Sequence, residues 1–272
     1  MVKSILVPTD FSLISENAIT HAAGIAQQTG ANLILTHVIN SDTRAYLKKN
    51  KESKDLVSEY LKDYQKQLRN DFNIRADIRV LEGKITEQIP ILVSELGIDL
   101  LMFGTHGKKG MQIITGSQAL KLINAVSIPV FVVQKRGFEE GYKTIVFPVN
   151  TSTEYKTKLK WTLFVAKSFN ATVKLFIYNE TRAKVKAKME EVLTNIRDTF
   201  LAHKINFTED IAEFKADFPK QIMEFSISNS AQLIVIKVDN DEFEPFFIIG
   251  SPEEKILFNT AQIPIFCVQK QL

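Results

Sequence analysis

Short apolar runs alternate along the chain with longer segments whose apolar residues recur at helical spacing. Residues 4–7 form a short apolar run that ends at a proline, which is typical of a buried strand. In the next segment Ser12 or Ser15 can cap the start of a helix, and Gly30 can adopt the left-handed conformation that ends it. The apolar residues at helical spacing between them are Ala18, Ala22, Ile25 and Ala26.

The alternation continues through the first half of the chain. The apolar runs predict further strands at residues 33–38, 74–81, 99–103 and 129–133. The helical spacing predicts further helices around residues 57–68, 89–96 and 116–126. Residues 74–81 alternate apolar and polar side chains, so this strand is expected near a sheet edge. Strands and helices in this order predict an α/β fold with a mostly parallel sheet covered on both faces.

The second half of the chain repeats the first. Residues 2–10 (VKSILVPTD) match 142–150 (YKTIVFPVN), and the same offset aligns 26–38 with 166–178, so that Asn170 stands where Gly30 ends the first helix. Two further pairs match at a slightly shorter offset: 98–104 with 231–237, and 127–135 with 262–270. We therefore predict two domains of one fold, residues 1–136 and 142–272. The charged, glycine-containing segment 137–141 is the predicted linker.

Composition and charge narrow the class of protein. The chain is 45% hydrophobic and 24% charged with a net charge of +3, and its Lys and Arg residues are scattered, so we expect no nucleic-acid partner. Cys267, the single cysteine, lies in the apolar run PIFCV, which predicts a buried, inert thiol and a reducing compartment. No apolar stretch approaches the ~18 residues of a membrane span, and the N-terminus has no long apolar region. We expect a cytoplasmic protein without a membrane partner.

Four of the eleven glycines fall in one loop, residues 104–117 (GTHGKKGMQIITGS). In open parallel sheets, ligands bind beyond the carboxyl ends of the strands. Three segments are expected at that edge: 8–10 after the first strand, 38–40 after the second, and the glycine loop after the fourth. Glycines let the backbone N–H groups approach an anion, and the loop leads into the start of a helix, where phosphate is favoured.

Side chains in these segments suit a mononucleotide. Ser117 can donate a hydroxyl, His106 and Lys108 can contact phosphate, and Asp10 can accept bonds from a ribose or an adenine amine. Asp10 can equally cap the following helix, and His106 and Lys108 can belong to a solvated surface loop. The loop matches neither the P-loop motif nor the G-x-G-x-x-G dinucleotide motif.

Four motifs in order resemble the universal stress protein family: VPTDFS near the N-terminus, GTHG after the fourth strand, a Gly-Ser helix start, and IPVFVV at the last strand. The second half has the same skeleton, so the chain resembles a tandem universal stress protein. The resemblance implies two doubly wound, Rossmann-like domains of the adenine-nucleotide alpha-hydrolase type. ATP-binding members carry G-x2-G-x9-G-[ST], whereas eight residues separate Gly107 from Gly116 in this chain. Related synthetases carry a Ser-Gly-Gly loop after the first strand, where this chain has 8–10 (PTD), so we set that class aside.

The resemblance also implies a ligand, a role and a set of binding residues. The ligand would be ATP, or AMP or ADP, with Mg or Mn held mainly through the phosphates, and the protein would be a stress-response sensor with an unknown protein partner. No catalytic residue is legible. The residues implied to bind the nucleotide are Pro8, Thr9, Asp10, Val38, Gly104, Thr105, His106, Gly107, Lys108, Gly116, Ser117 and Gln118.

The second half departs from this pattern at most of the matching positions. Asn150 replaces Asp10, and Lys237 replaces Gly104. Asp239, Asp241 and Glu242 then stand where a phosphate would lie, and Glu244 follows them. Their charge would repel a phosphate, so we predict nucleotide in the first repeat only. The acidic segment is either a solvated loop or one that binds a cation or shields the site.

Two alternatives to a nucleotide sensor stay open: a slow ATPase, and a scaffold or small-ligand protein whose nucleotide site has closed. The second repeat would in each case serve as a pairing partner. We expect the last strands, Pro129–Val133 and Pro264–Val268, to pair inside one molecule as a pseudo-dimer, which would bury two sheet edges. A further homodimer is possible on this arrangement.

Overall fold

The structure is a computed structural model that describes residues 2–105, 116–139, 141–152, 155–214, 217–238, 259 and 261–269. The chain divides into two compact units, Met1–Glu139 and Glu140–Leu272. Each unit is a mixed α/β structure built on parallel strands. The domain bounds inferred from the repeat, 1–136 and 142–272, stay a prediction.

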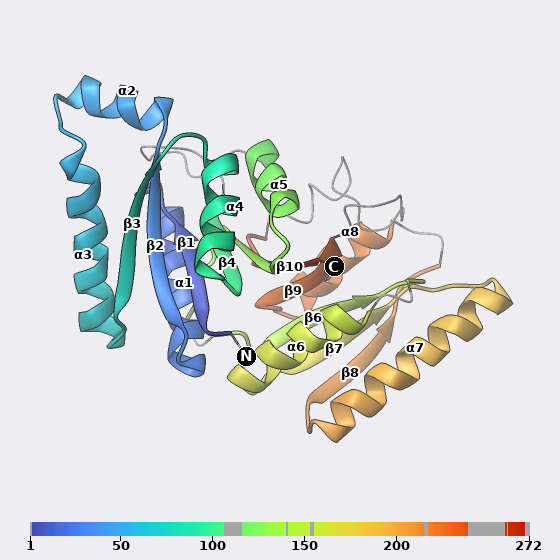
Figure 1. Cartoon of the computed structure of the whole chain (residues 1–272). Coiled ribbons are helices and arrows are strands. Elements are labelled where there is room, and N and C mark those ends of the chain that lie inside the picture. The colour runs from blue at the N-terminus through green and yellow to red at the C-terminus, as the bar shows by residue number, and fades with distance from the viewer. Residues whose placement is uncertain are drawn as a thin grey trace. The chain divides into compact units, whose positions relative to one another are not determined.

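The N-terminal unit has five strands in the order β3-β2-β1-β4-β5, all parallel. Helices α1 and α3 pack together on one face of the strands, and α4 and α5 pack together on the other (Figure 1). The bounds are β1 Ser4–Pro8, α1 Leu13–Thr29, β2 Asn32–Ile39, α2 Ser41–Asn50, α3 Asp55–Phe72, β3 Ala76–Glu82, α4 Ile85–Leu96, β4 Leu100–Gly104, α5 Gly116–Ala125 and β5 Val130–Val133. The doubly wound arrangement predicted from the sequence is confirmed.

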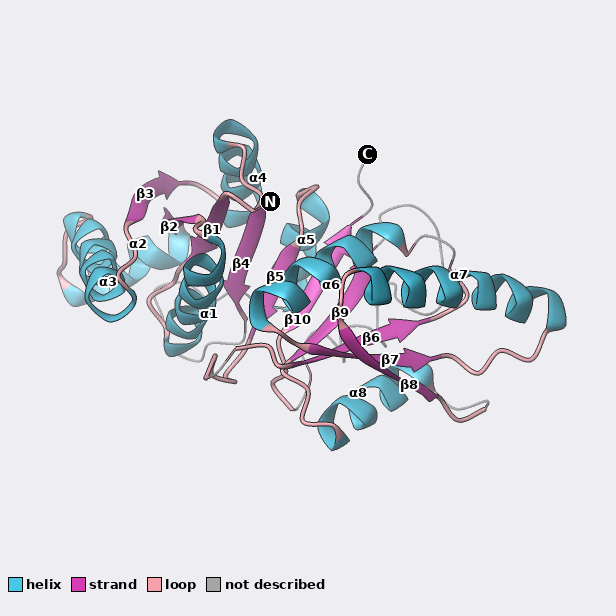
Figure 2. Cartoon of the chain, turned by 90° about the horizontal axis from the view of Figure 1, so that it is seen from below, coloured by secondary structure: helices cyan, strands magenta, loops and turns pink. Residues whose placement is uncertain are grey.

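The C-terminal unit repeats this order as β10-β9-β6-β7-β8, again all parallel. Helices α6 and α7 lie on one face and α8 on the other (Figure 2). The bounds are β6 Thr144–Val149, α6 Lys156–Phe169, β7 Thr172–Ile177, α7 Ala183–Ala202, β8 Asn206–Ile211, α8 Phe218–Ser228, β9 Leu233–Val238 and β10 Ile265–Gln269. Phe176 on β7 stacks with Phe218 and Phe225, which fixes α8 to its face of the sheet.

Caps set the helix ends where the sequence predicts them. The Ser12 hydroxyl accepts a hydrogen bond from the Ser15 backbone N–H at 3.3 Å, which caps α1. Gly30 ends α1 at φ 71°, and Asn170 ends α6 at φ 49°, so both matching positions adopt the left-handed conformation. The next most frequent residue after glycine in that conformation therefore performs the same task in the second unit.

Helix α2 was not expected from the sequence, because its residues are almost entirely polar. Asn40 nucleates it: the side-chain oxygen of Asn40 accepts hydrogen bonds from the backbone N–H groups of Asp42 and Thr43, each at 2.9 Å. Thr43 and Leu47 are its buried residues. The overlooked signal was Asn at a helix start followed by Asp in the first turn.

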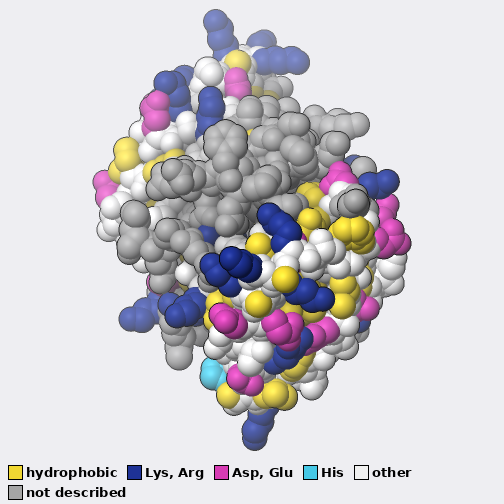
Figure 3. Space-filling model, turned by 90° about the vertical axis from the view of Figure 1, so that its right-hand side faces the viewer, with side chains coloured by type: hydrophobic (Ala, Val, Ile, Leu, Met, Phe, Trp, Pro, Cys, Tyr) yellow, Lys and Arg dark blue, Asp and Glu magenta, His cyan; other side chains and the backbone are white. Residues whose placement is uncertain are grey.

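The core of each unit is formed by its strands, whose inner residues are almost fully buried. Cys267 in β10 has no exposed surface, so its predicted burial is confirmed, and burial raises the pKa of its thiol. None of the helices in the described part of the chain is long and apolar enough to cross a membrane. On the face drawn in Figure 3, Lys and Arg side chains lie among Asp and Glu side chains.

Candidate nucleotide-binding site

The first candidate segment leaves β1 at the carboxyl end of the sheet. β1 runs beside β2 up to the pair Pro8 and Thr36, and the Thr9 backbone N–H donates to the Thr36 carbonyl at 2.8 Å. Thr9, the residue after β1, is therefore the last one in this segment that bonds to the neighbouring strand. The chain then turns into α1, which begins at Leu13.

The carboxylate of Asp10 is buried in this turn, with 8% of the residue exposed. One of its oxygens accepts a hydrogen bond from the Ser12 backbone N–H at 3.0 Å, while Ser12 itself caps α1. Asp10 therefore supports the turn without being the cap residue. No described residue donates to the other carboxylate oxygen, which leaves it able to accept a hydrogen bond from a ligand.

Thr9 and Phe11 shape the same turn. The Thr9 hydroxyl lies 2.9 Å from the Ser15 hydroxyl and accepts from the Phe11 backbone N–H at 3.1 Å. Phe11 adopts φ 63°, which is uncommon for a bulky residue. Its ring stacks on His37 at 4.8 Å between ring centroids and also contacts Tyr60 and Tyr64. These ring contacts compensate the strained backbone and hold the turn against β2 and α3.

His37 is a structural member of the site that the sequence did not indicate. Its Nδ1 lies 2.7 Å from the Thr9 carbonyl oxygen, so Nδ1 carries the proton and donates it. Its Nε2 lies 2.9 Å from the Thr43 hydroxyl. Burial lowers the pKa of His37, against smaller opposing effects of the Thr9 hydrogen bond and the Asp10 charge. The ring is therefore neutral near pH 7, and Nε2 accepts from Thr43.

Within the described residues, the bond from His37 to Thr9 leaves a backbone edge open at Val38. Along a parallel strand, alternate residues bond to opposite neighbours. Thr36 bonds toward β1, and Ile39 accepts from Gly83 on the β3 side. Val38 therefore directs its N–H and C=O toward the β1 side, beyond the point where β1 ends. The Thr9 carbonyl, which would be the next acceptor in that ladder, is 2.7 Å from His37 instead.

The C-terminal unit closes the same edge. The residue matching Val38 is Tyr178, and its backbone N–H donates to the carbonyl of Val149 at 2.8 Å. Val149 is the residue that matches Thr9. Asn150 keeps the local turn, since its side-chain oxygen accepts from the Ser152 N–H at 3.1 Å. The two units therefore share this turn but differ in the backbone N–H beside it. The N–H of Tyr178 is bonded to Val149, whereas the N–H of Val38 has no partner among the described residues.

Gly104, at the end of β4, has a packing reason to be glycine. A Cβ atom there would lie 2.7 Å from the backbone oxygen of Ile14 and 2.8 Å from its side chain. The absence of a side chain thus lets the first turn of α1 approach β4 closely. This packing requires glycine at position 104 whether or not a phosphate binds there. Thr105 is buried, and its N–H donates to the Val133 carbonyl at 3.0 Å.

The remaining predicted residues lie only partly in the described structure. His106, Gly107 and Lys108 lie outside the described residues, as do the acidic residues 239–244 of the second half. Gly116 and Ser117 begin α5, whose first turn holds no acidic residue, and Gln118 is half-buried. Since α5 follows β4, it begins at the same carboxyl edge as the Asp10 turn.

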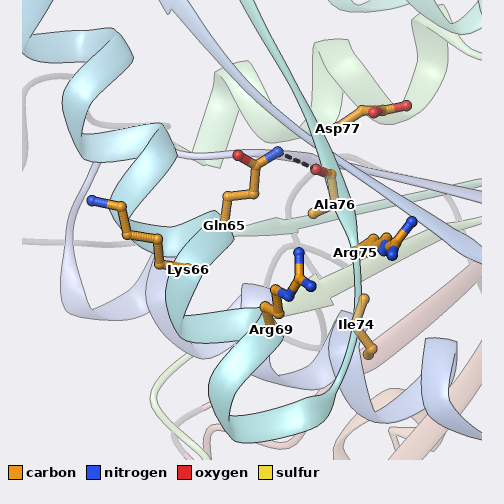
Figure 4. A pocket seen from close by; sticks show the side chains of 7 residues that line it. All are labelled: Gln65, Lys66, Arg69, Ile74, Arg75, Ala76 and Asp77. Atoms are coloured by element: carbon orange, nitrogen blue, oxygen red, sulfur yellow. Dashed lines mark hydrogen bonds between the residues drawn. The ribbon is translucent and has the colours of Figure 1, made fainter.

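A groove of about 530 Å³ lies elsewhere in the N-terminal unit, between the end of α3 and the start of β3 (Figure 4). It is at the amino end of β3, so it is separate from the strand ends described above. Gln65 spans it by donating to the Ala76 carbonyl at 2.5 Å. The residues that line it are Gln65, Lys66, Arg69, Ile74, Arg75, Ala76 and Asp77.

Comparison with known proteins agrees with this architecture. The model of the universal stress protein family matches residues 1–134. Universal stress protein MJ0531 of Methanocaldococcus jannaschii is 31% identical over 143 residues, which cover 50% of this chain and 84% of that protein. The chain belongs to the universal stress protein family.

Solved members of the family extend the comparison. A universal stress protein from Archaeoglobus fulgidus matches 98% of this chain and 96% of its own, with a TM-score of 0.74 and 16% identity, which speaks for the fold alone. Another universal stress protein was solved in complex with cAMP and matches 50% of this chain and 98% of its own, at 19% identity and a TM-score of 0.39.

Proposed function

We propose that the N-terminal unit binds an adenine nucleotide, ATP, ADP or AMP, and that the protein is a stress-response sensor whose occupancy a protein partner reads. The observation that carries the proposal is the difference at Val38. In the N-terminal unit His37 takes the Thr9 carbonyl and leaves the Val38 backbone edge open, whereas Tyr178 closes the matching edge in the C-terminal unit. An open N–H beside a C=O is what an adenine edge can pair with.

The residues around this edge fit the rest of a nucleoside. The free carboxylate oxygen of Asp10 would accept a ribose hydroxyl, and Pro8 and Thr9 would flank the sugar. The side chain of Asp10 is held in place by the Ser12 N–H, so binding would cost it little conformational freedom. The aromatic contacts of Phe11 keep the turn rigid.

The phosphates would lie toward the start of α5. The backbone N–H groups of Gly116 and Ser117, in a first turn free of acidic residues, favour an anion. In this proposal Thr105 to Lys108 and Gln118 complete the phosphate contacts. A Mg or Mn ion would be held mainly by the phosphates and would neutralise part of their charge.

Binding without turnover is the proposed activity, with at most weak ATP hydrolysis. A general base must lie within reach of the attacking water and be free to take its proton. Among the described residues near the site, His37 uses both ring nitrogens in structural bonds, and Asp10 serves the turn and the sugar. The nucleotide would therefore act as a signal that is bound and released.

The test is a calorimetric titration of ATP with magnesium into the nucleotide-free chain. We expect a stoichiometry near one per chain. Asp10→Asn keeps an acceptor for the Ser12 N–H and removes the charge, so it should weaken binding about tenfold, the effect of one charge-assisted hydrogen bond. Asn150→Ala, at the matching position of the C-terminal unit, is the control and should leave the titration unchanged.

Two results would contradict the proposal. A flat titration would mean that the site is closed, which is the scaffold alternative. A stoichiometry near two, with one site lost in each variant, would mean that both units bind nucleotide. Phosphate release at the rate of ATP consumption, abolished in Asp10→Asn while binding persists, would instead favour the slow ATPase.

We also propose that the last strands, Pro129–Val133 and Pro264–Val268, pair inside one molecule. Both segments are apolar and buried, and a strand edge of this kind is prone to aggregate unless it is paired. The pairing predicts a monomer by sedimentation at micromolar concentration. A dimer that dissociates when Val132 is replaced by Lys would mean that the edges pair between molecules instead.

A further inference from the structure

The C-terminal unit carries a buried lysine where the N-terminal unit has alanine. Lys158 lies in the first turn of α6 and matches Ala18 of α1. Only 6% of Lys158 is exposed. Lysine is almost never buried unless a partner offsets the cost of removing its charge from water, so its surroundings need an explanation.

The described surroundings of Lys158 stabilise a cation but do not neutralise it. Its Nζ donates to the Pro148 carbonyl at 2.5 Å and lies 4.1 Å from the centre of the Phe147 ring. No described carboxylate lies within 4.0 Å of it. An ammonium group has three N–H donors, and a carbonyl accepts only one of them here.

The ammonium group sits at the carboxyl end of the sheet. Pro148 is the penultimate residue of β6, so the Nζ of Lys158 is held at the end of the strand and not beneath its middle. Lys237, near the end of the neighbouring strand β9, is the described residue whose charge acts on Lys158. Burial, and to a smaller extent the charge of Lys237, together lower the pKa of Lys158 to about 7.

We propose that this end of the C-terminal unit binds a compact oxyanion, a phosphate or sulfate group, which the ammonium group of Lys158 contacts directly and the side chain of Lys237 flanks. A tetrahedral oxyanion offers several acceptors around one centre and carries the charge that two neighbouring cations attract. The first turn of α6 contains no acidic residue and has no side-chain cap, so its backbone N–H groups reinforce the positive potential.

The binding chemistry differs from that of the N-terminal unit. There, the matching positions are Ala18 and Gly104, which contribute no charge, and the proposed phosphate contacts come from backbone N–H groups. In the C-terminal unit, two lysine side chains supply the charge. The second repeat would thus retain a site for a small anion at the same sheet edge, against the repulsion expected from the acidic residues 239–244, which lie outside the described residues. It would lack the open Val38 edge that an adenine requires.

Trp161 provides the measurement. It is the only tryptophan of the chain, it follows Lys158 by one turn of α6, and it packs against Phe266 of the same unit. Sodium sulfate, titrated against a background of constant ionic strength in sodium chloride, should change its fluorescence saturably with a Kd on the order of 1 mM. Lys158→Met should weaken binding at least tenfold and Lys237→Met about threefold to tenfold. Lys160→Met, on the exposed face of the same helix, should change it less than twofold.

The pH dependence is a second, independent readout. Sulfate does not titrate near neutrality, so the pH dependence reports the protein. The anion binds the ammonium form of Lys158, whose pKa in the free protein is about 7. Affinity should therefore be constant below pH 7 and fall up to about tenfold per pH unit above it. Lys158→Met should abolish that slope, and its fold is checked by thermal unfolding.

A parallel titration compares the affinities for inorganic phosphate and ribose 5-phosphate, and so distinguishes a free ion from the phosphoryl group of a larger molecule. Equal affinities would mean a free ion, and tighter binding of ribose 5-phosphate would mean the phosphoryl group of a larger molecule. None of these probes contains adenine, so failure of the nucleotide proposal leaves this test intact. Absence of a saturable change with every probe, or binding unaltered in both Lys158→Met and Lys237→Met, would overturn the inference.

Discussion

The strands of the two units follow the same order, but different side chains stand at their ends. In the N-terminal unit, Thr9 and Asp10 follow β1, and small residues let α1 lie against β4. In the C-terminal unit, Val149 and Asn150 follow β6, and two lysines occupy the positions of Ala18 and Gly104. Each unit keeps its sheet, because the strand interiors are apolar in both. The fold therefore tolerates a change of side-chain chemistry at this edge.

The helices that follow β1 and β6 begin at different matching positions. α1 begins at Leu13, whereas α6 begins at Lys156, which matches Glu16. The C-terminal unit already holds a lysine side chain at position 237, while the first turn of α1 leaves no room for a side chain at Gly104. A valine at position 104 should therefore lower the free energy of unfolding more than a valine at position 237.

The largest effect is expected from Gly104→Val. The new side chain would meet the backbone of Ile14, which cannot move without shifting α1. We expect a loss of about 3 kcal/mol or more in the free energy of unfolding, at the upper end for overpacking. Urea unfolding measures it, with Lys237→Val as the matched control. Similar losses in both variants would contradict the packing difference. The same reasoning makes Gly104 variants unsuitable for testing nucleotide binding.

Lys158→Met should stabilise the protein by about 1–4 kcal/mol at pH 7 in the absence of oxyanions, because it replaces a buried charge with an apolar side chain of similar size. The folded-state pKa of about 7 lies below the usual 10.5, so the unfolded chain binds more protons between these values. Wild-type stability should therefore rise from pH 7 to pH 10, and the variant should lack that rise. Denaturant unfolding of wild type and variant across this pH range measures both effects. A variant less stable than wild type at pH 7 would contradict the burial of Lys158 without a compensating charge.

His21 should make the N-terminal unit sensitive to acid. It is 1% exposed, its Nε2 lies 2.9 Å from the Arg136 carbonyl, and burial lowers its pKa to about 4. Since the neutral form is favoured in the folded state, stability is lost as pH falls from 6.5 toward 4, by about 2 kcal/mol at pH 5. His37 adds to the loss in the same direction.

Unfolding at pH 7.5 and pH 5 tests this contribution. His21→Gln should flatten the difference between the two pH values, whereas the exposed His203→Gln should preserve it. An unchanged difference in His21→Gln would mean that acid sensitivity arises elsewhere.

The smallest effect is expected from His37→Leu, which would make the N-terminal edge resemble the C-terminal one. Without His37, the Thr9 carbonyl becomes available to the Val38 N–H, as Val149 is to Tyr178. Adenine would lose one hydrogen-bond donor, so ATP affinity should fall about tenfold or less. Calorimetry measures the affinity. Thr43→Val, which removes the hydroxyl contacts to His37 Nε2 and to the Asn40 side-chain oxygen but keeps the bond from His37 to Thr9, is the milder control. ATP affinity that is unchanged in His37→Leu would remove Val38 from the site.

The strand and helix order, the caps at Ser12, Gly30 and Asn170, and the internal repeat could all be predicted from the sequence. Each depends on local periodicity or on one residue with a special backbone conformation. Helix α2 could not, because a polar helix stabilised by the Asn40 cap lacks an apolar stripe. Motif order also indicated the family, while the placement of Asp10 and Val38 beside a nucleotide stays a prediction.

The roles of His37, Gly104 and Lys158 depend on tertiary structure. The sequence alone determined the elements and the family, because apolar spacing and short motifs are local properties of the chain. Tertiary structure decided that His37 leaves the Val38 edge open, that Gly104 must lack a side chain, and that Lys158 is buried beside Lys237. Each of these follows from contacts between residues far apart in the chain, whose distance and burial no local pattern encodes.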